Sequence, residues 1–123
     1  SFKPKYEQVW PWIMEANRTL LTTNVTKGRT GITSDPGGTI SAVTACIFTD
    51  ADGRKLVVSS SMLDFTEANG MTNSAAITGV PDGTYDVLWE NRTVTVDDGT
   101  IKDTWKPYTY HFYQLKTGDT GMK

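Results

Sequence analysis

The stretch ISAVTACIFT at residues 40–49, followed by ADGR at residues 51–54, decides the fold of this chain. Residues 40–49 are apolar on both alternating faces, which predicts a central strand that is buried from two sides. Asp-Gly supplies the positive φ that tight hairpins need, so residues 51–54 predict a hairpin turn. Residues 55–63 are then expected to return as the partner strand. The centre of the chain is therefore predicted to be an antiparallel pair.

Short strands separated by turn residues continue outward from this hairpin. Threonine and valine are frequent, and such β-branched side chains fit a pleated surface. Loops are expected at SDPGG (34–38) and at residues 64–70, and tight turns at PDG (81–83) and DDG (97–99). The remaining strands are expected at residues 71–78, 84–91, 93–96, 100–104 and 108–115.

Helical periodicity is confined to residues 6–21. Apolar side chains recur on one side of Ile13, as they do along an amphipathic helix. Pro11 fits only the first turn of such a helix, and Trp12 then points away from the apolar stripe. We therefore expect a helical lead-in within residues 1–23.

Together these patterns predict an all-β fold, a two-sheet antiparallel β-sandwich of seven or eight strands with one short N-terminal helix. The length of 123 residues corresponds to one domain, so residues 1–123 are expected to share a single core. The polar segment 116–123 is expected to be a frayed tail.

Charge and composition exclude several classes of function. The 12 basic and 14 acidic residues give a net charge of −2, so the basic excess that nucleic acid requires is missing. No apolar run approaches the roughly 20 residues of a membrane span. The single cysteine, Cys46, excludes an internal disulfide, and the single histidine, His111, excludes a His-rich metal centre.

A catalytic role is not expected. His111 lies on a predicted strand, and SSS at residues 59–61 lies on another strand rather than on a nucleophile elbow. Most carboxylates fall in turns, where aspartate is favoured because it hydrogen-bonds the backbone.

Two of these acidic turns are candidates for calcium. Calcium normally takes about 6 to 8 oxygen ligands, and each turn supplies only two carboxylates. Turn formation is therefore favoured over calcium binding, and no cofactor is expected. The calcium candidates are Asp50, Asp52, Asp97 and Asp98.

Residues 80–115 combine several motifs in the order VPDGTYDVLWENRTVTVDDGTIKDTWKPYTYHFYQL. A P-D-G-x-Y turn at 81–85 leads into a strand ending aromatic-Glu-x-Arg at 89–92. A D-x-aromatic-x-P-Y stretch at 103–108 precedes a strand containing H-x-Y at 111–113. This order resembles the closing strands of the C-terminal β-sandwich, of Ig-like or carbohydrate-binding type, that follows the (β/α)8 barrel of many bacterial glycoside hydrolases.

The resemblance implies a non-catalytic accessory module of a secreted, polysaccharide-degrading enzyme, because the catalytic carboxylates of such enzymes lie on barrel strands. Two roles follow from it. The module binds a plant-type polysaccharide, or it packs against the covalently linked catalytic barrel without binding sugar. An Ig-like protein-interaction domain is the third hypothesis.

Sugar binding requires exposed aromatic rings. Alternation along residues 84–91 places Tyr85, Val87 and Trp89 on one face, so Trp89 is expected in the core. Trp105 is also expected to be packed rather than exposed.

The last strand offers two alternative faces. Tyr110 and Phe112 share one face, and His111 and Tyr113 share the other. If the first pair faces the core, the second pair is exposed and forms an aromatic platform together with the N-terminal tryptophans. The candidate carbohydrate-binding residues are therefore Trp12, Tyr113, His111 and Trp10.

Overall fold

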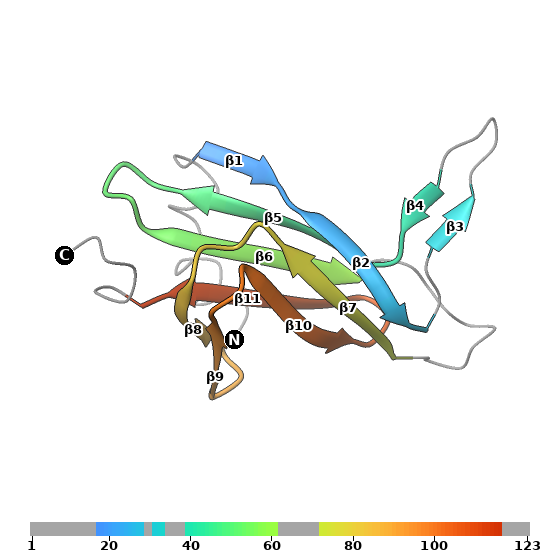
Figure 1. Cartoon of the computed structure of the whole chain (residues 1–123). Helices are drawn as coiled ribbons and strands as arrows, with labels where there is room; N and C mark the ends of the chain where they lie inside the picture. The colour runs from blue at the N-terminus through green and yellow to red at the C-terminus, as the bar shows by residue number, and fades with distance from the viewer. Residues whose placement is uncertain (1–16, 29–30, 34–38, 62–71, 117–123) are drawn as a thin grey trace.

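The computed structural model describes residues 17–28, 31–33, 39–61 and 72–116. These residues form antiparallel β-strands and contain no helix (Figure 1). A helix that could cross a membrane is accordingly not found in the described part of the chain.

The larger sheet has six strands in the order β1-β5-β6-β11-β8-β9. Every neighbouring pair in it is antiparallel. The strands are β1 (Asn17–Leu20), β5 (Thr44–Thr49), β6 (Lys55–Ser61), β8 (Gly83–Val87), β9 (Arg92–Val96) and β11 (Thr109–Leu115).

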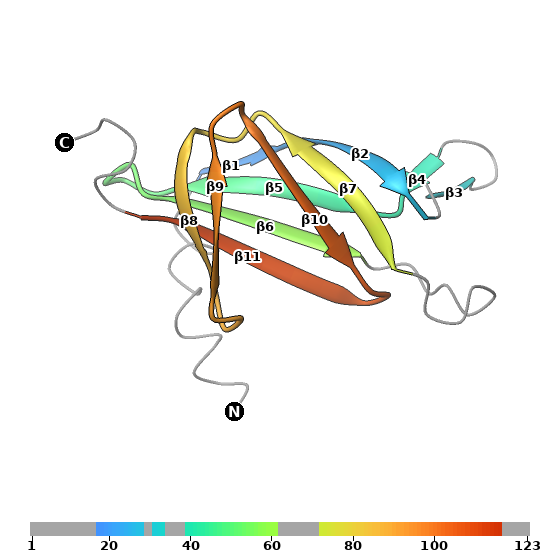
Figure 2. The same ribbon diagram turned by 60° about the horizontal axis from the view of Figure 1, so that its bottom comes forward.

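The smaller sheet has three strands in the order β10-β7-β2, and it lies across the larger sheet in both views (Figures 1 and 2). A separate two-stranded hairpin lies at the opposite end of the molecule from β8 and β9. The smaller sheet consists of β2 (Thr22–Lys27), β7 (Asn73–Thr78) and β10 (Thr100–Trp105), and the hairpin of β3 (Gly31–Thr33) and β4 (Thr39–Ser41).

One apolar core lies between the two sheets, so the fold is sandwich-like. Alternate residues of each strand enter it, as the period of two requires. Trp105 of the smaller sheet and Tyr85 and Tyr113 of the larger sheet are its largest fully buried side chains. The core also contains Val43, Ala45, Ile47, Val57, Ala75, Ile77, Val80, Val87, Val96, Ile101 and Leu115.

The chain passes from the larger sheet to the smaller sheet between β1 and β2. Leu21 separates β1, which pairs with β5, from β2, which pairs with β7. The Leu21 N–H donates to the Ala45 carbonyl at 3.0 Å, and the Leu21 side chain packs against the core. At another crossover, the Tyr85 hydroxyl donates to the Pro81 carbonyl at 2.6 Å, which fixes the entry into β8.

The predicted helix is wrong where the structure describes it. Asn17–Leu20 and Thr22–Lys27 are strands, whereas residues 6–16 lie outside the described residues. Residues 17–20 have a strand partner in β5, and this long-range pairing outweighs the local helical pattern. The number of strands also exceeds seven or eight, because β1, β2 and β3 were not expected and the strand at 40–49 divides into β4 and β5.

The predicted central hairpin is confirmed. β5 and β6 pair directly, and Gly53 takes a φ of 80° in the turn between them. The Asp50 carboxylate accepts hydrogen bonds from the Asp52 N–H at 3.0 Å and the Arg54 N–H at 2.8 Å. At the other end of the chain, the Lys116 N–H donates to the Thr84 carbonyl at 2.9 Å, so the expected tail does not begin at residue 116.

Gly28 follows the last residue of β2, at a position where the structure leaves no room for a side chain. Its φ is +102°, and a Cβ built there would lie 2.0 Å from Oδ1 of the buried Asn73. Gly99 also has a positive φ, +76°, but a Cβ there would lie 3.7 Å from its nearest neighbour, the Val80 carbonyl oxygen. Gly28→Ala is therefore expected to lower the free energy of unfolding by about 1–3 kcal/mol more than Gly99→Ala, as measured by chemical denaturation. Equal losses would mean that the Asn73 side chain moves aside without cost.

Candidate functional site

An aromatic row lies on the outer face of the larger sheet. Tyr110 and Phe112 project from β11 with their ring centroids 6.1 Å apart and an interplanar angle of 24°. Trp89, in the turn between β8 and β9, meets Phe112 edge to face at 5.2 Å. Trp89 is 41% exposed and Tyr110 49% exposed. Tyr110, Phe112 and Trp89 are called the aromatic row below.

The turn after β8 places Trp89 in this row. β8 ends at Val87, and residues 88–91 form the turn into β9. Trp89 has a φ of 65° and Asn91 a φ of 55°, both in the left-handed region that residues other than glycine rarely adopt. The strand alternation therefore stops before Trp89, and the expectation that Trp89 lies in the core is wrong.

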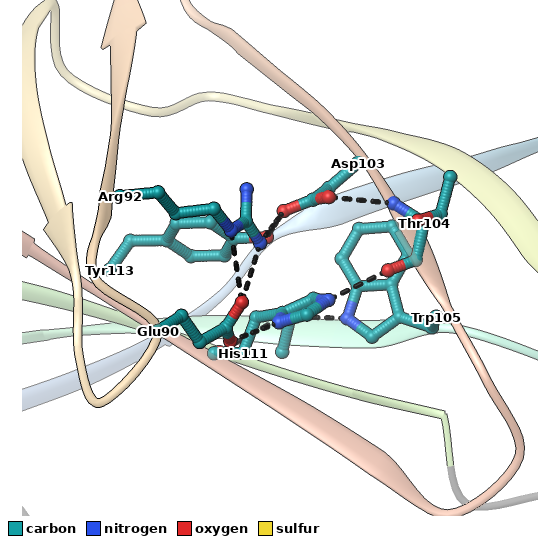
Figure 3. Close-up of polar contacts among 8 residues, drawn as sticks. Glu90, Arg92, Asp103, Thr104, Trp105, His111 and Tyr113 are labelled. Atoms are coloured by element: carbon teal, nitrogen blue, oxygen red, sulfur yellow. Dashed lines mark hydrogen bonds and ion pairs between the residues drawn. The ribbon is translucent and has the colours of Figure 1, made fainter.

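Charged side chains anchor both flanks of this turn (Figure 3). Arg92 donates from Nε to Glu90 Oε1 at 2.9 Å and from Nη2 to Asp103 Oδ2 at 2.7 Å. Glu90 Oε2 lies 2.5 Å from His111 Nδ1. Glu90, Arg92, Asp103 and His111 are called the charged cluster below, and they join the β8–β9 turn to β10 and β11.

His111 uses both of its ring nitrogens inside the molecule. Nδ1 faces the Glu90 carboxylate, and Nε2 lies 2.7 Å from the Thr104 carbonyl oxygen. Each ring nitrogen thus has a hydrogen-bond partner within the fold. The ring is also packed against Trp105, at 5.3 Å between centroids. His111 is therefore held on both sides of its ring by contacts inside the molecule.

Asp103 on β10 accepts hydrogen bonds from Arg92 and Tyr113 of the larger sheet. Burial alone would raise the pKa of the Asp103 carboxyl, but hydrogen bonds from Tyr113 and Arg92 outweigh burial and hold this pKa below its usual value. Burial and the neighbouring Asp103 carboxylate raise the pKa of the Tyr113 hydroxyl, which donates to Asp103 at 2.6 Å. Asp103 is thus ionised and Tyr113 neutral at pH 7.

An open groove of about 580 Å³ adjoins the aromatic row. It is lined by Trp89 and by residues with polar side chains. These residues are Asp86, Asn91, Arg92, Thr93 and Gln114, and Val87 and Leu88 complete the lining.

The structure buries the two described aromatic candidates that the sequence analysis placed at the surface. His111 is 9% exposed and Tyr113 is fully buried, so neither offers a ring face at the surface. Tyr110 and Phe112 take the outer face instead, and Trp105 is buried as expected. Trp10 and Trp12 lie outside the described residues.

The acidic candidates form turns. Asp50 accepts backbone hydrogen bonds and forms an ion pair with Arg54 at 2.6 Å. Asp98 Oδ1 accepts from the Thr100 N–H at 3.2 Å. Within the described residues, no three His, Cys, Asp or Glu side chains are grouped as metal ligands would be. The favoured interpretation, turn formation, explains the Asp50 and Asp98 contacts.

Comparisons with known proteins give no match for this chain, whether with protein-family models, curated proteins or solved structures. The candidate site is therefore defined by its own geometry. Its aromatic part comprises Trp89, Tyr110 and Phe112, which the sequence interpretation did not select. Asn91 is the signal that could have identified Trp89, because asparagine favours turns with positive φ and so marks an earlier end of the strand.

The Asp103→Asn variant tests how much the charged cluster contributes to stability and to its pH dependence. The lowered pKa of Asp103 means that its ionised form stabilises the fold at pH values above the unfolded-state pKa, and this contribution is lost as pH falls through the folded-state pKa. Replacing this acceptor of charged hydrogen bonds is expected to cost about 1.5–3 kcal/mol at pH 7 and to flatten the acid decline in stability. Denaturation from pH 7 downward measures both effects, with Asp52→Asn in an exposed turn as control. A variant that keeps the full acid decline would contradict this role of Asp103.

Proposed function

We propose that this chain is a non-catalytic, carbohydrate-binding β-sandwich domain of a secreted glycoside hydrolase. The observation that supports it is the aromatic row beside a groove lined with residues that carry amide, hydroxyl and carboxylate groups. The face of an aromatic ring is electron-rich and attracts the C–H face of a pyranose. The polar groups of the groove can exchange hydrogen bonds with the sugar hydroxyls.

The contacts of the polar side chains support a binding role over a catalytic one. Both nitrogens of His111 are engaged, and Ser59 Oγ donates to the His111 carbonyl while accepting from Trp105 Nε1 at 3.0 Å. A serine and a histidine in these contacts lack the mutual hydrogen bond of a nucleophile and its base. The resemblance of residues 80–115 to glycosidase accessory modules points to the same role.

Docking on a catalytic barrel is the second candidate function. An apolar strip crosses four strands of the outer face, where Leu20 pairs with Cys46, Cys46 with Val58, and Val58 with Phe112. Leu20 is 78% exposed. Cys46, Val58 and Phe112 are half-buried, and a strip of this kind with an exposed leucine at its end is typical of a surface that packs against another domain.

Affinity electrophoresis in gels containing cellulose, xyloglucan, xylan or mannan tests the proposal. At least one of these polysaccharides is expected to retard the chain. Trp89→Ala and Tyr110→Ala are each expected to weaken the interaction about fivefold to tenfold, because a stacked ring contributes ~0.5–1.5 kcal/mol beyond the area it buries. Thermal melts establish that each variant is folded.

Tyr108→Ala is the matched control. Tyr108 is 57% exposed but lies in the turn before β11, outside the aromatic row, so its loss should leave retardation unchanged. Retardation by none of the polysaccharides, together with association with a separately expressed catalytic barrel, would replace sugar binding by docking. The absence of both would favour the Ig-like interaction domain.

A further inference from the structure

The turn that carries Trp89 is conformationally strained. Two of its four residues, Trp89 and Asn91, have positive φ although neither is glycine. Such backbone conformations cost free energy and persist when surrounding contacts impose them. The position of the Trp89 ring therefore depends on whatever holds residues 88–91.

Backbone contacts hold only the base of this turn. The Leu88 N–H donates to the Phe112 carbonyl at 2.8 Å, and the Glu90 N–H donates to the Val87 carbonyl at 3.2 Å. These two bonds join the turn to β11 and to the end of β8. The side chains of Glu90 and Arg92 make further contacts.

Glu90 makes the side-chain contacts next to Trp89. One carboxylate oxygen accepts from Arg92 at 2.9 Å, and the other lies 2.5 Å from His111 Nδ1. Figure 3 shows the Glu90 carboxylate between the Arg92 guanidinium and the His111 ring. Arg92 is itself held by Asp103 at 2.7 Å. Glu90 thereby ties the turn to two neighbouring strands, β9 and β11.

We propose that Glu90 is the positioning residue of the carbohydrate site, holding Trp89 in the aromatic row through its contacts with Arg92 and His111. This inference rests on the proposed function. Glu90 points toward the charged cluster, whereas Trp89 meets Phe112 on the outer face. Glu90 therefore affects binding by positioning Trp89, and it does not touch the ligand itself.

A double-mutant cycle on the full chain tests this role. The polysaccharide that most strongly retards the wild-type chain is the probe, and affinity is measured for Glu90→Ala, Trp89→Ala and the double variant. Glu90→Ala is expected to weaken binding about fivefold to tenfold, and to have no further effect when Trp89 is already replaced. Asp52→Ala, which removes an exposed carboxylate from the β5–β6 turn, is the control and should bind as the wild type does.

Glu90→Gln separates positioning from a general loss of structure. Glutamine keeps an acceptor for Arg92 and an amide group that can hydrogen-bond His111 Nδ1, so it is expected to restore most of the affinity lost in Glu90→Ala. The ring environment of Trp89 provides a second readout. Tryptophan fluorescence of Glu90→Ala should differ from the wild type by a component that disappears when Trp89 is also replaced.

Each result decides between specific alternatives. Losses that multiply in the double variant would mean that Glu90 contacts the sugar itself, and would overturn the positioning role. A lower melting temperature with unchanged affinity of the folded protein would show that Glu90 is only structural. A wild-type chain that no polysaccharide retards would defeat the proposed function, and this inference with it.

Discussion

The hydrogen bonds between Arg92 and Asp103 and around His111 connect two sheets that share no backbone ladder in the described residues. In the ladders, β9 pairs with β8 and β10 pairs with β7. Side chains make the connections between β10 and the larger sheet, from Arg92, His111 and Tyr113. A charged group in a partly buried place is stabilised when it is paired, so these contacts favour one relative position of the two sheets. Both the apolar core and the outer aromatic row depend on that position.

The aromatic row follows from this arrangement because successive residues of β11 face opposite sides. His111 and Tyr113 are directed inward by their partners on β10, and the Trp105 indole donates to Ser59 beside them. Tyr110 and Phe112 must then lie on the outer face. The aromatic row on the outer face is thus a consequence of the polar contacts inside the sandwich.

The same contacts link the fold to the proposed function through one short turn. Its left-handed residues, Trp89 and Asn91, cost free energy that regular strand residues do not. Glu90 lies between these two residues in the chain and Arg92 follows them, and both provide compensating contacts. Binding surfaces often lie on loops that a rigid scaffold positions, and this turn fits that description.

Much of the architecture could be predicted from local patterns. The hairpin around Gly53 and the strands β7, β9, β10 and β11 are present at close to the expected bounds, because Asp-Gly turns and alternating residues act over short distances. The prediction was wrong for residues 17–20, where pairing with β5 outweighs helical periodicity. It was also wrong for Trp89, where a turn interrupts the strand alternation.

The sequence by itself determined that residues 110 and 112 share one face of their strand and residues 111 and 113 the other, because side chains alternate in any extended chain. Only the tertiary structure decided which face is outside. That choice depends on Asp103 and Trp105, which lie on another strand in another sheet and meet β11 only after folding. Alternation is a local property of the backbone, whereas the partners of His111 and Tyr113 are brought together by long-range contacts.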